Sequence, residues 1–507
     1  MNSIFISSIP KKKKSPLNLE NQRGIFLVPK IRSILVKLIY NSIIGVIEDN
    51  LTSSNIGARK GRAPRDHLFV LHSVVTETLR GNEGCDLVFY DVVQCFDSLW
   101  VEKTLTDLHT NGVTSNLLNV IHELCRTARV KVKTPVGTTE EKEIEDIVMQ
   151  GETLSSILCT NSMDLIAKEC KLEEFTYKDN VKIPKIGFVD DVLDINKCGK
   201  ETPEMNEYTR DEMNKRKLQL SYDKCARMHV KGKSENENRT ECEKVVIDKW
   251  EINKERKGSE TELRDIHKGE VPIRNVDEYL YLGDLIRSDG SSKANIKLRL
   301  NKGHGIIRDI LQILEEIYLG PFFFEALKQL RDSMFVSVIT YNLEVSSNLS
   351  KSDLKALNDL DLTLLRKALL LSSKSSKHLI YLETGILSIE FILKKKRIMY
   401  LHNLLSSDDS SLSKKVLMAQ IRNPKRTDWF KLVKNDLKDL NIPLNPDEIV
   451  QFSKDALKKK VREACQNAFF DMLIGKKNKM SKGKEIEYKA FETQSYLKGE
   501  NKVPKEI

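Results

Sequence analysis

The sequence predicts a mixed α/β fold up to about residue 290 and an all-helical fold beyond it. In the first part, short apolar runs typical of strands alternate with helical segments, and KIGFVDDVLDI at 185–195 is predicted as a strand pair. A chain of 507 residues is expected to form two or three domains. In the second part, apolar residues recur at helical spacing: Ile307, Ile310, Leu311, Leu314, Ile317, Leu354, Leu357, Leu360 and Leu364.

The elements of the mixed part follow from these patterns in chain order. A helix is predicted over residues 28–49, and a short apolar strand over 86–91. Two further helices are predicted at about 98–109 and 115–129. Residues 128–148 alternate around a Pro-Val-Gly hinge, which predicts a pair of strands.

The same alternation continues toward the helical part. A helix is predicted over residues 154–170, and a polar helix at about 203–217 follows the strand pair. Residues 231–270 are charged and poor in large apolar side chains, so they are predicted to form an exposed insertion. Strand character returns at 277–286, and the lysine-rich end of the chain is expected to be loosely ordered.

Composition narrows the class of protein. Hydrophobic residues make up 40% of the chain, enough for a substantial core, and the formal net charge of +10 mildly favours a polyanionic partner. The nine cysteines show no CxxC spacing, which argues against a zinc site or a disulfide framework and fits a reducing compartment.

The N-terminal residues and the hydropathy pattern bear on localisation. No stretch approaches the ~20 apolar residues that a membrane span needs. The start, MNSIFISSIPKKKK, reverses the order of a secretory signal, so we expect an intracellular protein, in the nucleus and/or cytoplasm, that is not secreted. Lys11, Lys12, Lys13 and Lys14 would serve as a nuclear address or simply form a solvated basic loop.

Acidic residues stand at the ends of predicted strands. Asp190 and Asp191 lie inside an otherwise apolar run, and Asp91 ends another. Burying a carboxylate is costly without a cation or a partner. Carboxylates at the ends of neighbouring strands can converge on Mg²⁺, which prefers oxygen ligands, and two such ions ~3.5–4 Å apart can support phosphoryl transfer. The alternative is that these aspartates belong to ordinary surface turns.

Several blocks resemble the motifs of reverse transcriptases in the family's order. DVVQCFD (91–97) resembles motif A and FVDD (188–191) resembles motif C. QGETLS (150–155), LSYDKCARM (220–228) and YLYLGDLIRSDGS (279–291) resemble motifs B, D and E. Motif B ends in Leu-Ser-Ser where the family usually has Leu-Ser-Pro, but none of the departures removes a metal ligand.

Two upstream blocks point to one branch of that family. NQRGIFLVPKIRSIL (21–35) and SNIGARKGRAPRDHLF (54–69) resemble the fingers blocks of non-LTR (LINE-type) retrotransposons. The resemblance implies an α+β right-hand polymerase with an antiparallel palm sheet. Its parts would be fingers over 1–85, palm over 86–290 with the insertion at about 231–270, a helical thumb over 291–345 and a helical C-terminal region over 346–507.

The resemblance implies roles in metal binding and catalysis for several matching residues. Asp91, Asp190 and Asp191 would be catalytic and would bind two Mg²⁺ ions, with Mn²⁺ as a substitute. Lys224 would be the general acid for the pyrophosphate leaving group, or an ordinary exposed lysine. Asp97 is expected to cap the following helix, together with Ser98, rather than bind metal.

Nucleotide-binding roles follow in the same way. Phe96 would exclude a 2′-hydroxyl and so select deoxynucleotides, unless it is simply a core phenylalanine. Gln150 and Gly151 would let the backbone approach the template base and the nucleotide, since glycine has no Cβ. Arg23, with one or more of Lys11–Lys14, would contact the triphosphate.

Nucleic-acid contacts are assigned to two further groups. The first group would bind template phosphates and consists of Arg59, Lys60, Arg62 and Arg65. The alternative is that these four residues form a solvated charged face. The second resembles the primer grip, or consists of core strand residues: Tyr281, Leu282 and Gly283.

The predicted function is RNA-directed DNA synthesis by a non-LTR retrotransposon reverse transcriptase. Its partners would be an RNA template, a DNA primer and deoxynucleoside triphosphates, with no membrane. The chain looks like a fragment that lacks the endonuclease of a complete element, and that missing part is a further expected partner. The alternatives are a truncated or domesticated non-catalytic nucleic-acid-binding relative and, more weakly, an intron maturase or a viral RNA polymerase.

Overall fold

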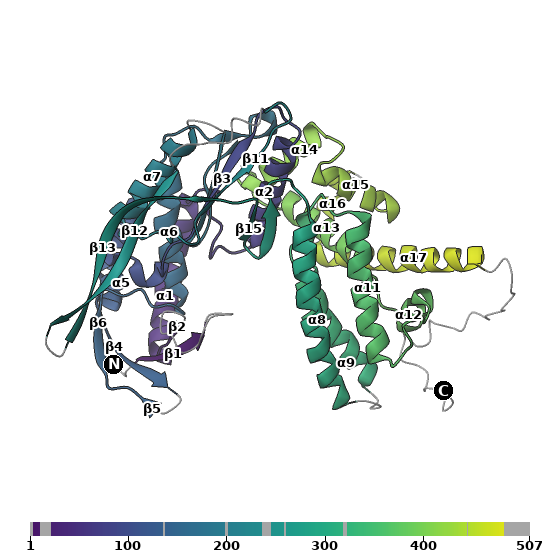
Figure 1. Cartoon of the computed structure of the whole chain (residues 1–507), viewed down its shortest axis with the longest axis horizontal. Helices are drawn as coiled ribbons and strands as arrows, with labels where there is room; N and C mark the ends of the chain where they lie inside the picture. The colour runs from purple at the N-terminus through teal and green to yellow at the C-terminus, as the bar shows by residue number, and fades with distance from the viewer. Residues whose placement is uncertain are drawn as a thin grey trace. The chain divides into compact units, whose positions relative to one another are not determined.

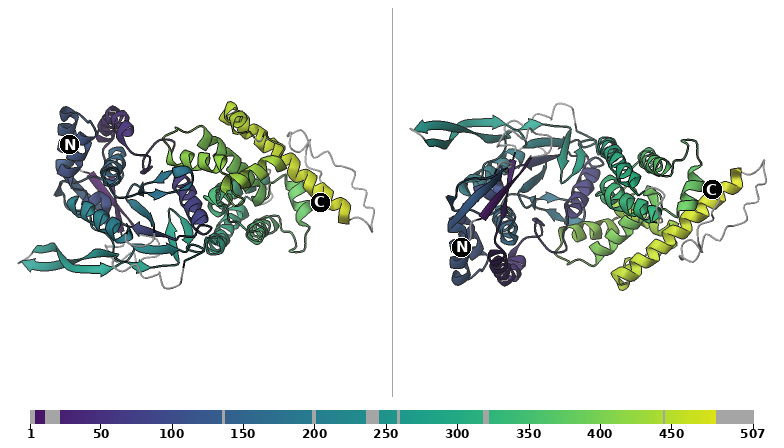
Figure 2. Two further views of the ribbon diagram at one scale, coloured as in Figure 1. Left: turned by 90° about the horizontal axis from the view of Figure 1, so that it is seen from above. Right: turned by 90° about the horizontal axis from the view of Figure 1, so that it is seen from below.

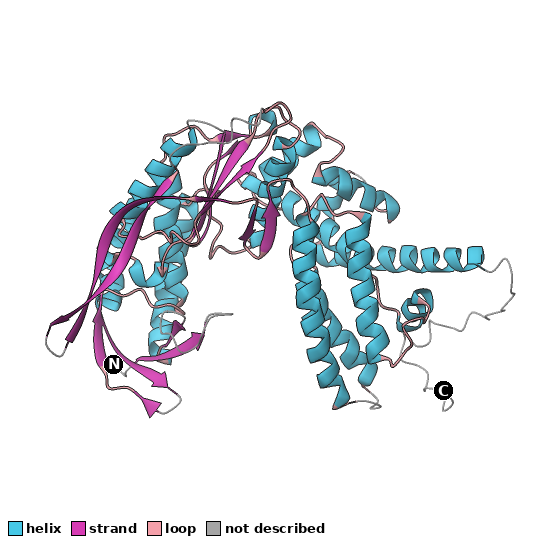
Figure 3. Cartoon of the chain, in the orientation of Figure 1, coloured by secondary structure: helices cyan, strands magenta, loops and turns pink. Residues whose placement is uncertain are grey.

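The computed structural model describes residues 4–10, 22–134, 137–197, 201–235, 245–257, 260–317, 322–443 and 445–480, without the side chains of 251–265 and 474–480. The chain divides into two compact units, Met1–Tyr279 and Leu280–Ile507 (Figure 1). Strands occur throughout the first unit, whereas the described elements after the hairpin β15–β16 are all helical (Figure 3). The predicted change from α/β to helical character near residue 290 is therefore confirmed.

A five-stranded sheet forms the centre of the first unit. Its strand order is β14–β11–β3–β10–β9, in which β10 pairs antiparallel with both β3 and β9. Every residue of β3 is buried, which explains why this strand reads as a continuous apolar run. The predicted strands at 86–91 and 185–195 are confirmed. The bounds are β3 (Cys85–Tyr90), β9 (Ile186–Phe188), β10 (Asp191–Lys197), β11 (Ala226–Val230) and β14 (Arg274–Asn275).

Helices pack against this sheet and share one core with it. Apolar side chains of β3 and β10 pack against those of the surrounding helices, and these contacts fix the sheet against the helices. The helices of this unit are α1 (Lys30–Asn50), α2 (Pro64–Thr78), α3 (Cys95–Ser98), α4 (Val101–Thr110), α5 (Ser115–Arg126), α6 (Thr153–Lys168) and α7 (Glu201–Lys215).

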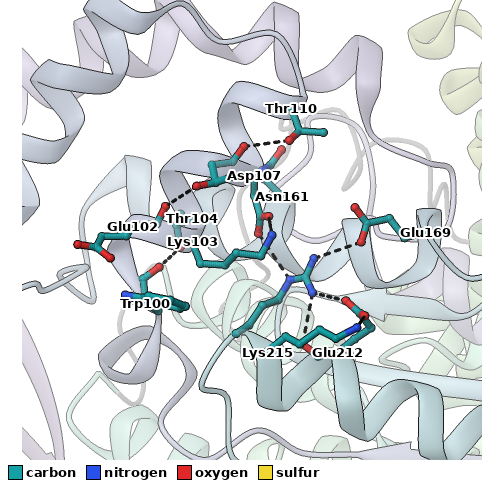
Figure 4. Close-up of polar contacts among 12 residues, drawn as sticks. Trp100, Glu102, Lys103, Thr104, Asp107, Thr110, Asn161, Glu169, Glu212 and Lys215 are labelled. Carbon is teal, nitrogen blue, oxygen red and sulfur yellow. Dashed lines mark hydrogen bonds and ion pairs between the residues drawn. The ribbon is translucent and has the colours of Figure 1, made fainter.

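A buried arginine contacts carboxylates of three of these helices, and Figure 4 labels those carboxylates as Asp107, Glu169 and Glu212. Arg216 follows α7, and its side chain is 2% exposed. Its guanidinium lies 2.6 Å from Glu212 of α7, 3.5 Å from Asp107 of α4 and 3.7 Å from Glu169 at the end of α6. Because a buried charge is stable only when it is compensated, these carboxylates fix α7 against α4 and α6.

A second sheet has the order β2–β1–β4–β5, with β6 also paired to β4. The helix predicted over 115–129 ends at Arg126, and β4 begins at Thr127. Residues 130–133 pair in parallel with β1, with Val130 opposite Ile4, and residues 127–130 pair antiparallel with β6, so sheet pairing overrides the helical pattern. The bounds are β1 (Ile4–Pro10), β2 (Gln22–Leu27), β4 (Thr127–Thr134), β5 (Gly137–Thr138) and β6 (Lys142–Glu145).

The charged segment 231–270 contains regular structure. Much of it forms a long antiparallel hairpin, β12 (Val246–Lys257) with β13 (Glu260–Pro272), whose outer part projects from the first unit (Figure 2). The inner part of this ribbon joins the main core of the unit through Ile247 and Val271. Residues 236–244 and 258–259 lie outside the described part. The short elements β7 (Phe175–Thr176), η2 (Lys178–Asn180) and β8 (Lys182–Ile183) complete the unit.

The strand character predicted at 277–286 belongs to a hairpin of two strands. β15 (Glu278–Tyr281) and β16 (Asp284–Arg287) are joined by Leu282 and Gly283, both of which have positive φ angles, 47° and 83°. Two consecutive positive φ angles are typical of tight hairpin turns. The division between the two units falls within β15.

The second unit is a helical assembly. Ile307, Ile310 and Leu314 of α8 are buried, as predicted from their spacing, whereas Ile317 lies beyond that helix and is 40% exposed. Arg331 forms a buried two-bond ion pair with Asp361, at 2.7 and 2.8 Å. The bounds are α8 (Lys293–Glu315), α9 (Phe323–Leu330), η4 (Arg331–Val336), α10 (Ser337–Ile339), η5 (Leu343–Val345), α11 (Lys351–Ala368), α12 (Lys377–Thr384), α13 (Ile389–Leu405), α14 (Leu412–Arg422), α15 (Trp429–Asp439), α16 (Pro446–Gln451) and α17 (Lys454–Met480).

Within the described residues, no helix is long and apolar enough to cross a membrane. Residues 481–507, which hold most of the lysine-rich end of the chain, lie outside the described part.

Candidate active site

Three aspartates meet at one end of the β3–β10 strand pair. Asp91 directly follows β3, and Asp191 is the first residue of β10. Val192 pairs with Tyr90, so one further step in the same antiparallel register sets Asp91 opposite Asp191. Asp190 lies in the two-residue turn between β9 and β10. The structure thus brings the three predicted catalytic carboxylates together from two neighbouring strands.

The electrostatics of this cluster leave it short of positive charge. Burial, followed by the negative charges of Asp190 and Asp91, raises the pKa of Asp191 to about 7. Burial also raises the pKa of Asp190, and the neighbouring Asp91 adds to that effect. Such shifts arise where carboxylates share a partly desolvated site without enough cations.

The turn that carries Asp190 is conformationally unusual. Val189 precedes it with a φ angle of +61°. A β-branched residue rarely adopts this left-handed conformation, which costs of order 1–3 kcal/mol and persists only where the surroundings enforce it. The position of Asp190 therefore depends on what holds the turn.

Lys224 supplies the nearest fixed cation. Its ammonium nitrogen lies 2.6 Å from Oδ2 of Asp91, although the lysine side chain is 58% exposed. The loop of Lys224 is fastened to the end of β3, because the Ser221 amide donates to the Asp91 carbonyl at 2.8 Å. The Tyr279 hydroxyl donates to the Lys224 carbonyl at 3.1 Å. Two separate contacts thus hold the predicted general acid beside the aspartates.

The three carboxylates fit a divalent cation in donor type and in charge. Mg²⁺ binds carboxylate oxygens, and a cation would neutralise the repulsion that raises the pKa values of Asp190 and Asp191. Across the described residues, no group of three or more His, Cys, Asp or Glu side chains already stands in a metal-binding arrangement. Asp91 would have to exchange its ion pair with Lys224 to bind a metal.

Of the predicted nucleotide-binding residues, Arg23 lies on β2, and Gln150 and Gly151 lie beside that strand. Arg23 is exposed on β2, and its charge slightly lowers the pKa of Asp190. The Gln150 carbonyl accepts a hydrogen bond from the Phe26 amide at 3.2 Å. Gly151 has a φ angle of +112°, which a residue with a side chain would rarely adopt. Lys11–Lys14 lie outside the described residues.

Phe96 lies in the short helix α3 and packs, half-buried, against the main core. The prediction that Asp97 and Ser98 cap the next helix is wrong. Asp97 is inside α3, and α4 begins after Trp100 without a side-chain capping bond. The apolar Leu99–Trp100 pair separates the two helices and moves the cap position away from the aspartate.

The four predicted template-binding residues differ in exposure. Lys60 is exposed, and Arg62 and Arg65 are half-buried. The side chain of Arg59 is only 9% exposed and turns inward, where its Nε lies 2.8 Å from Glu48. The basic run therefore does not present a single charged face.

The predicted primer-grip residues belong to the second unit. Tyr281 is buried at the end of β15, and Leu282 and Gly283 form the turn of that hairpin.

Sequence reasoning missed a buried ion pair at the start of α6. Arg32 of α1 lies 2.6 Å from Glu152, and it also donates to the Leu124 carbonyl at 3.0 Å. This pair fixes the residue that follows Gln150 and Gly151. Glu152 was visible within motif B, but its partner lies 120 positions earlier on a helix with no distinguishing pattern.

A sheet with carboxylates at the ends of two adjacent strands, followed by a helical region, defines a right-hand polymerase palm. Residues 9–283, more than half of the chain, match the family described as reverse transcriptase (RNA-dependent DNA polymerase). The chain therefore belongs to the reverse transcriptase family. The predicted fold class and the predicted class of enzyme, an RNA-directed DNA polymerase, are confirmed at this level.

Solved structures similar to the chain include telomerases of two yeasts. Telomerase of Candida tropicalis, truncated from its C-terminal domain, shows 14% identity and a TM-score of 0.30 over 46% of this chain and 51% of its own. The same telomerase with the TWJ fragment of telomeric RNA shows 14% identity and a TM-score of 0.36 over 88% and 63%. Telomerase of Candida albicans with that fragment shows 13% identity and a TM-score of 0.32 over 82% and 64%.

The chain spans less than two thirds of the length of these telomerase chains. A search of curated proteins found no match to the sequence.

Proposed function

We propose that this chain is the reverse transcriptase of a non-LTR, LINE-type retrotransposon, copying an RNA template into DNA from a DNA primer and deoxynucleoside triphosphates. The observation that carries the proposal is the cluster of Asp91, Asp190 and Asp191, whose charge calls for cations. The assignment to the non-LTR branch rests on the two fingers blocks and on the YLG–SDGS run.

The three aspartates would hold two Mg²⁺ ions, with Mn²⁺ as a substitute. Bound there, the ions would lower the pKa of the primer 3′-hydroxyl and stabilise the charge that develops on the α-phosphate. Lys224, whose ammonium nitrogen lies 2.6 Å from Asp91, would protonate the leaving pyrophosphate.

Other residues would select and orient the substrates. Phe96 would exclude the 2′-hydroxyl of a ribonucleotide from the site. Gln150 and Gly151, held by Phe26, would contact the incoming nucleotide through the backbone. Arg23 would bind its triphosphate from β2.

Two groups of residues would contact the nucleic acid. Lys60, Arg62 and Arg65 would bind template phosphates, and Tyr281, Leu282 and Gly283 would support the primer terminus. Fingers, palm, thumb and C-terminal region would divide as 1–85, 86–290, 291–345 and 346–507. Nicking of a target would be the task of an endonuclease elsewhere in the element.

Primer extension on an RNA template with Mg²⁺ and deoxynucleotides tests the proposal. The wild type should extend, and Asp190→Asn should lose at least ~10²–10³-fold in rate, the typical effect of removing one group that stabilises transition-state charge. Binding of the primer–template, measured by fluorescence anisotropy, should remain. Asp309→Asn, an exposed aspartate of α8, is the matched control.

Two results would contradict the proposal. If neither protein extends while both bind the primer–template, the chain is the non-catalytic nucleic-acid-binding relative. If Phe96→Ala leaves the choice between deoxy- and ribonucleotides unchanged, Phe96 is only a core residue.

A further inference from the structure

A short loop between α1 and α2 covers the edge of the central sheet beside the catalytic turn. We call residues 52–57 the clasp loop. The amide of Ile56 donates to the carbonyl of Gly187 at 3.1 Å, and the amide of Gly187 donates to the carbonyl of Ser54 at 3.0 Å. Asn55 and Gly187 thus form a parallel β-bridge on β9, an edge strand of the sheet.

The clasp loop also contacts the strained residue of the turn directly. A Cβ added to Gly57 would lie 2.3 Å from the backbone nitrogen of Val189, closer than real Cβ atoms approach other atoms. Only glycine therefore allows the loop to press against Val189, whose φ angle is +61°. Asp190 is the next residue along the chain.

Helix α6 anchors one side of the clasp loop. The amide and hydroxyl of Thr52 donate to the buried carboxylate of Asp164 at 2.9 and 2.5 Å. The Thr160 hydroxyl donates to the Gly57 carbonyl at 3.1 Å. Both ends of the loop are thereby fixed to a helix in the core of the first unit.

Arg59 closes the loop from the other side. Its Nη1 donates to the carbonyls of Thr52 and Asn55 at 2.5 and 3.0 Å. Its Nε lies 2.8 Å from Glu48, in the last turns of α1. One guanidinium thus links α1 to the start and the middle of the clasp loop, and its side chain is 9% exposed. Planar, multiple hydrogen bonds of this kind are a property of arginine that lysine does not share.

We propose that Arg59 is a positioning residue for the polymerase reaction: through the clasp loop it holds the Val189–Asp190 turn in place. This inference rests on the proposed function. It assigns Arg59 a different role from a template-phosphate contact, and Gly57 becomes the point at which the loop supports the turn.

Arg59→Gln distinguishes a positioning role from a template-phosphate contact. The substitution removes the guanidinium group but keeps a polar side chain. If Arg59 is a positioning residue, Arg59→Gln should lower kcat by roughly 10- to 100-fold, because a displacement of a catalytic group by about 1 Å can reduce the rate that much. The Kd for primer–template and its dependence on salt should stay unchanged. A phosphate contact would instead weaken binding and reduce the salt slope by about one.

Native-state hydrogen exchange gives a readout that does not need activity. The amides of Ile56 and Gly187 should exchange at least tenfold faster in Arg59→Gln than in the wild type, while amides within β3 stay protected. Arg126→Gln, an exposed arginine of α5, should change neither exchange nor kinetics. Lys60→Gln should weaken template binding without changing exchange at these two amides.

Glu48→Gln and Gly57→Ala test two other contacts of the same arrangement. Glu48 pairs with Arg59, and Gly57 lies against Val189. Glu48→Gln should lower kcat in the same direction as Arg59→Gln, and the double variant should be no worse than Arg59→Gln alone. Gly57→Ala should lower kcat at unchanged Kd. If Arg59→Gln does not fold, these two variants decide.

Unchanged kcat together with weaker, less salt-dependent binding would overturn the positioning role. Unchanged exchange at Ile56 and Gly187 would also overturn it. If the wild type itself fails to extend a primer, the proposed function fails, and the exchange measurement still shows whether Arg59 holds the clasp loop.

Discussion

The two ends of the β3–β10 strand pair carry acidic side chains in opposite electrostatic settings. At one end, Asp86 is buried, 2.7 Å from Arg227 and 2.9 Å from His229, and it accepts a hydrogen bond from Thr202 at 2.8 Å. Burial alone would raise the pKa of Asp86, but the hydrogen bond with His229 and the charge of Arg227 outweigh it and lower that pKa. At the other end, burial and neighbouring carboxylates raise the pKa of Asp191 to about 7.

The difference teaches how the same sheet separates structure from function. The partners that stabilise Asp86, Arg227 and His229, are built into the adjacent strand β11, so that this carboxylate stabilises the folded state. In the cluster of Asp91, Asp190 and Asp191, by contrast, Asp91 forms an ion pair with Lys224, whose side chain is 58% exposed. The unbalanced charge of the cluster destabilises the folded protein, as the raised pKa values of Asp190 and Asp191 indicate, and a cation bound there would relieve that repulsion.

Removing the built-in carboxylate should have the largest effect on stability. Asp86→Asn leaves Arg227 buried at 3% exposure without its counter-ion. Breaking a buried pair by removing one partner costs about 3–5 kcal/mol. Urea unfolding should show this loss, and the double variant Asp86→Asn with Arg227→Gln should recover part of it. A loss below about 1 kcal/mol would break the comparison.

The dependence of stability on pH should be opposite at the two ends. Asp191 binds its proton more tightly in the folded state, so its contribution is full below the unfolded pKa near 4 and is lost as the pH rises through about 7. Asp86 has a lowered pKa, so its contribution is present above pH 4 and is lost only as the pH falls below it.

Unfolding in EDTA at pH 5 and pH 8 measures the Asp191 contribution. Between these two values, the wild type should lose about 2–3 kcal/mol more than Asp191→Asn. Equal changes in the two proteins would show that Asp191 is not destabilised by its neighbours.

Adding the external cation should restore stability at the catalytic end only. Free Mg²⁺ at about 30 times its Kd should raise the free energy of unfolding by about 2 kcal/mol at pH 8. Asp190→Asn should show little of this increase, whereas Asp309→Asn should keep it. An equal increase in all three proteins would mean that Mg²⁺ binds elsewhere.

Replacing the exposed cation should have the smallest effect. Lys224 and Asp91 form a pair whose side chains are 58% and 24% exposed, so solvent screens it. Lys224→Gln should change the free energy of unfolding by less than about 1 kcal/mol, as for other surface pairs. A loss comparable to that of Asp86→Asn would show that both ends carry built-in compensation.

Much of the fold could be predicted because its patterns are local. The apolar run of β3 and the helical spacing in α8 and α11 each identify an element by themselves. The boundary between α5 and β4 could not be predicted, because Thr127 belongs to a strand only through its pairing with Glu145, which lies later in the sequence. The turn of the hairpin β15–β16 could not be predicted either, because Leu282 and Gly283 interrupt the strand character of 277–286 without a polar break.

The site divides in the same way. Asp91, Asp190 and Asp191 stand out as carboxylates in apolar surroundings, so their sequence alone predicted a shared location. The roles of Arg59 and Arg32 could not be predicted, because each depends on partners that only the folded chain brings next to the arginine. A basic residue in a charged run looks the same whether it turns outward or inward.

The β-bridge between Asn55 and Gly187 has a consequence for the behaviour of the protein in solution. An uncovered edge strand offers free backbone groups to which a strand of another molecule can add, the first step of many aggregation reactions. Because the clasp loop occupies Gly187 on both its amide and its carbonyl, β9 cannot be extended in this way. The hydrogen bonds that hold the clasp loop against β9 therefore also protect this edge of the sheet.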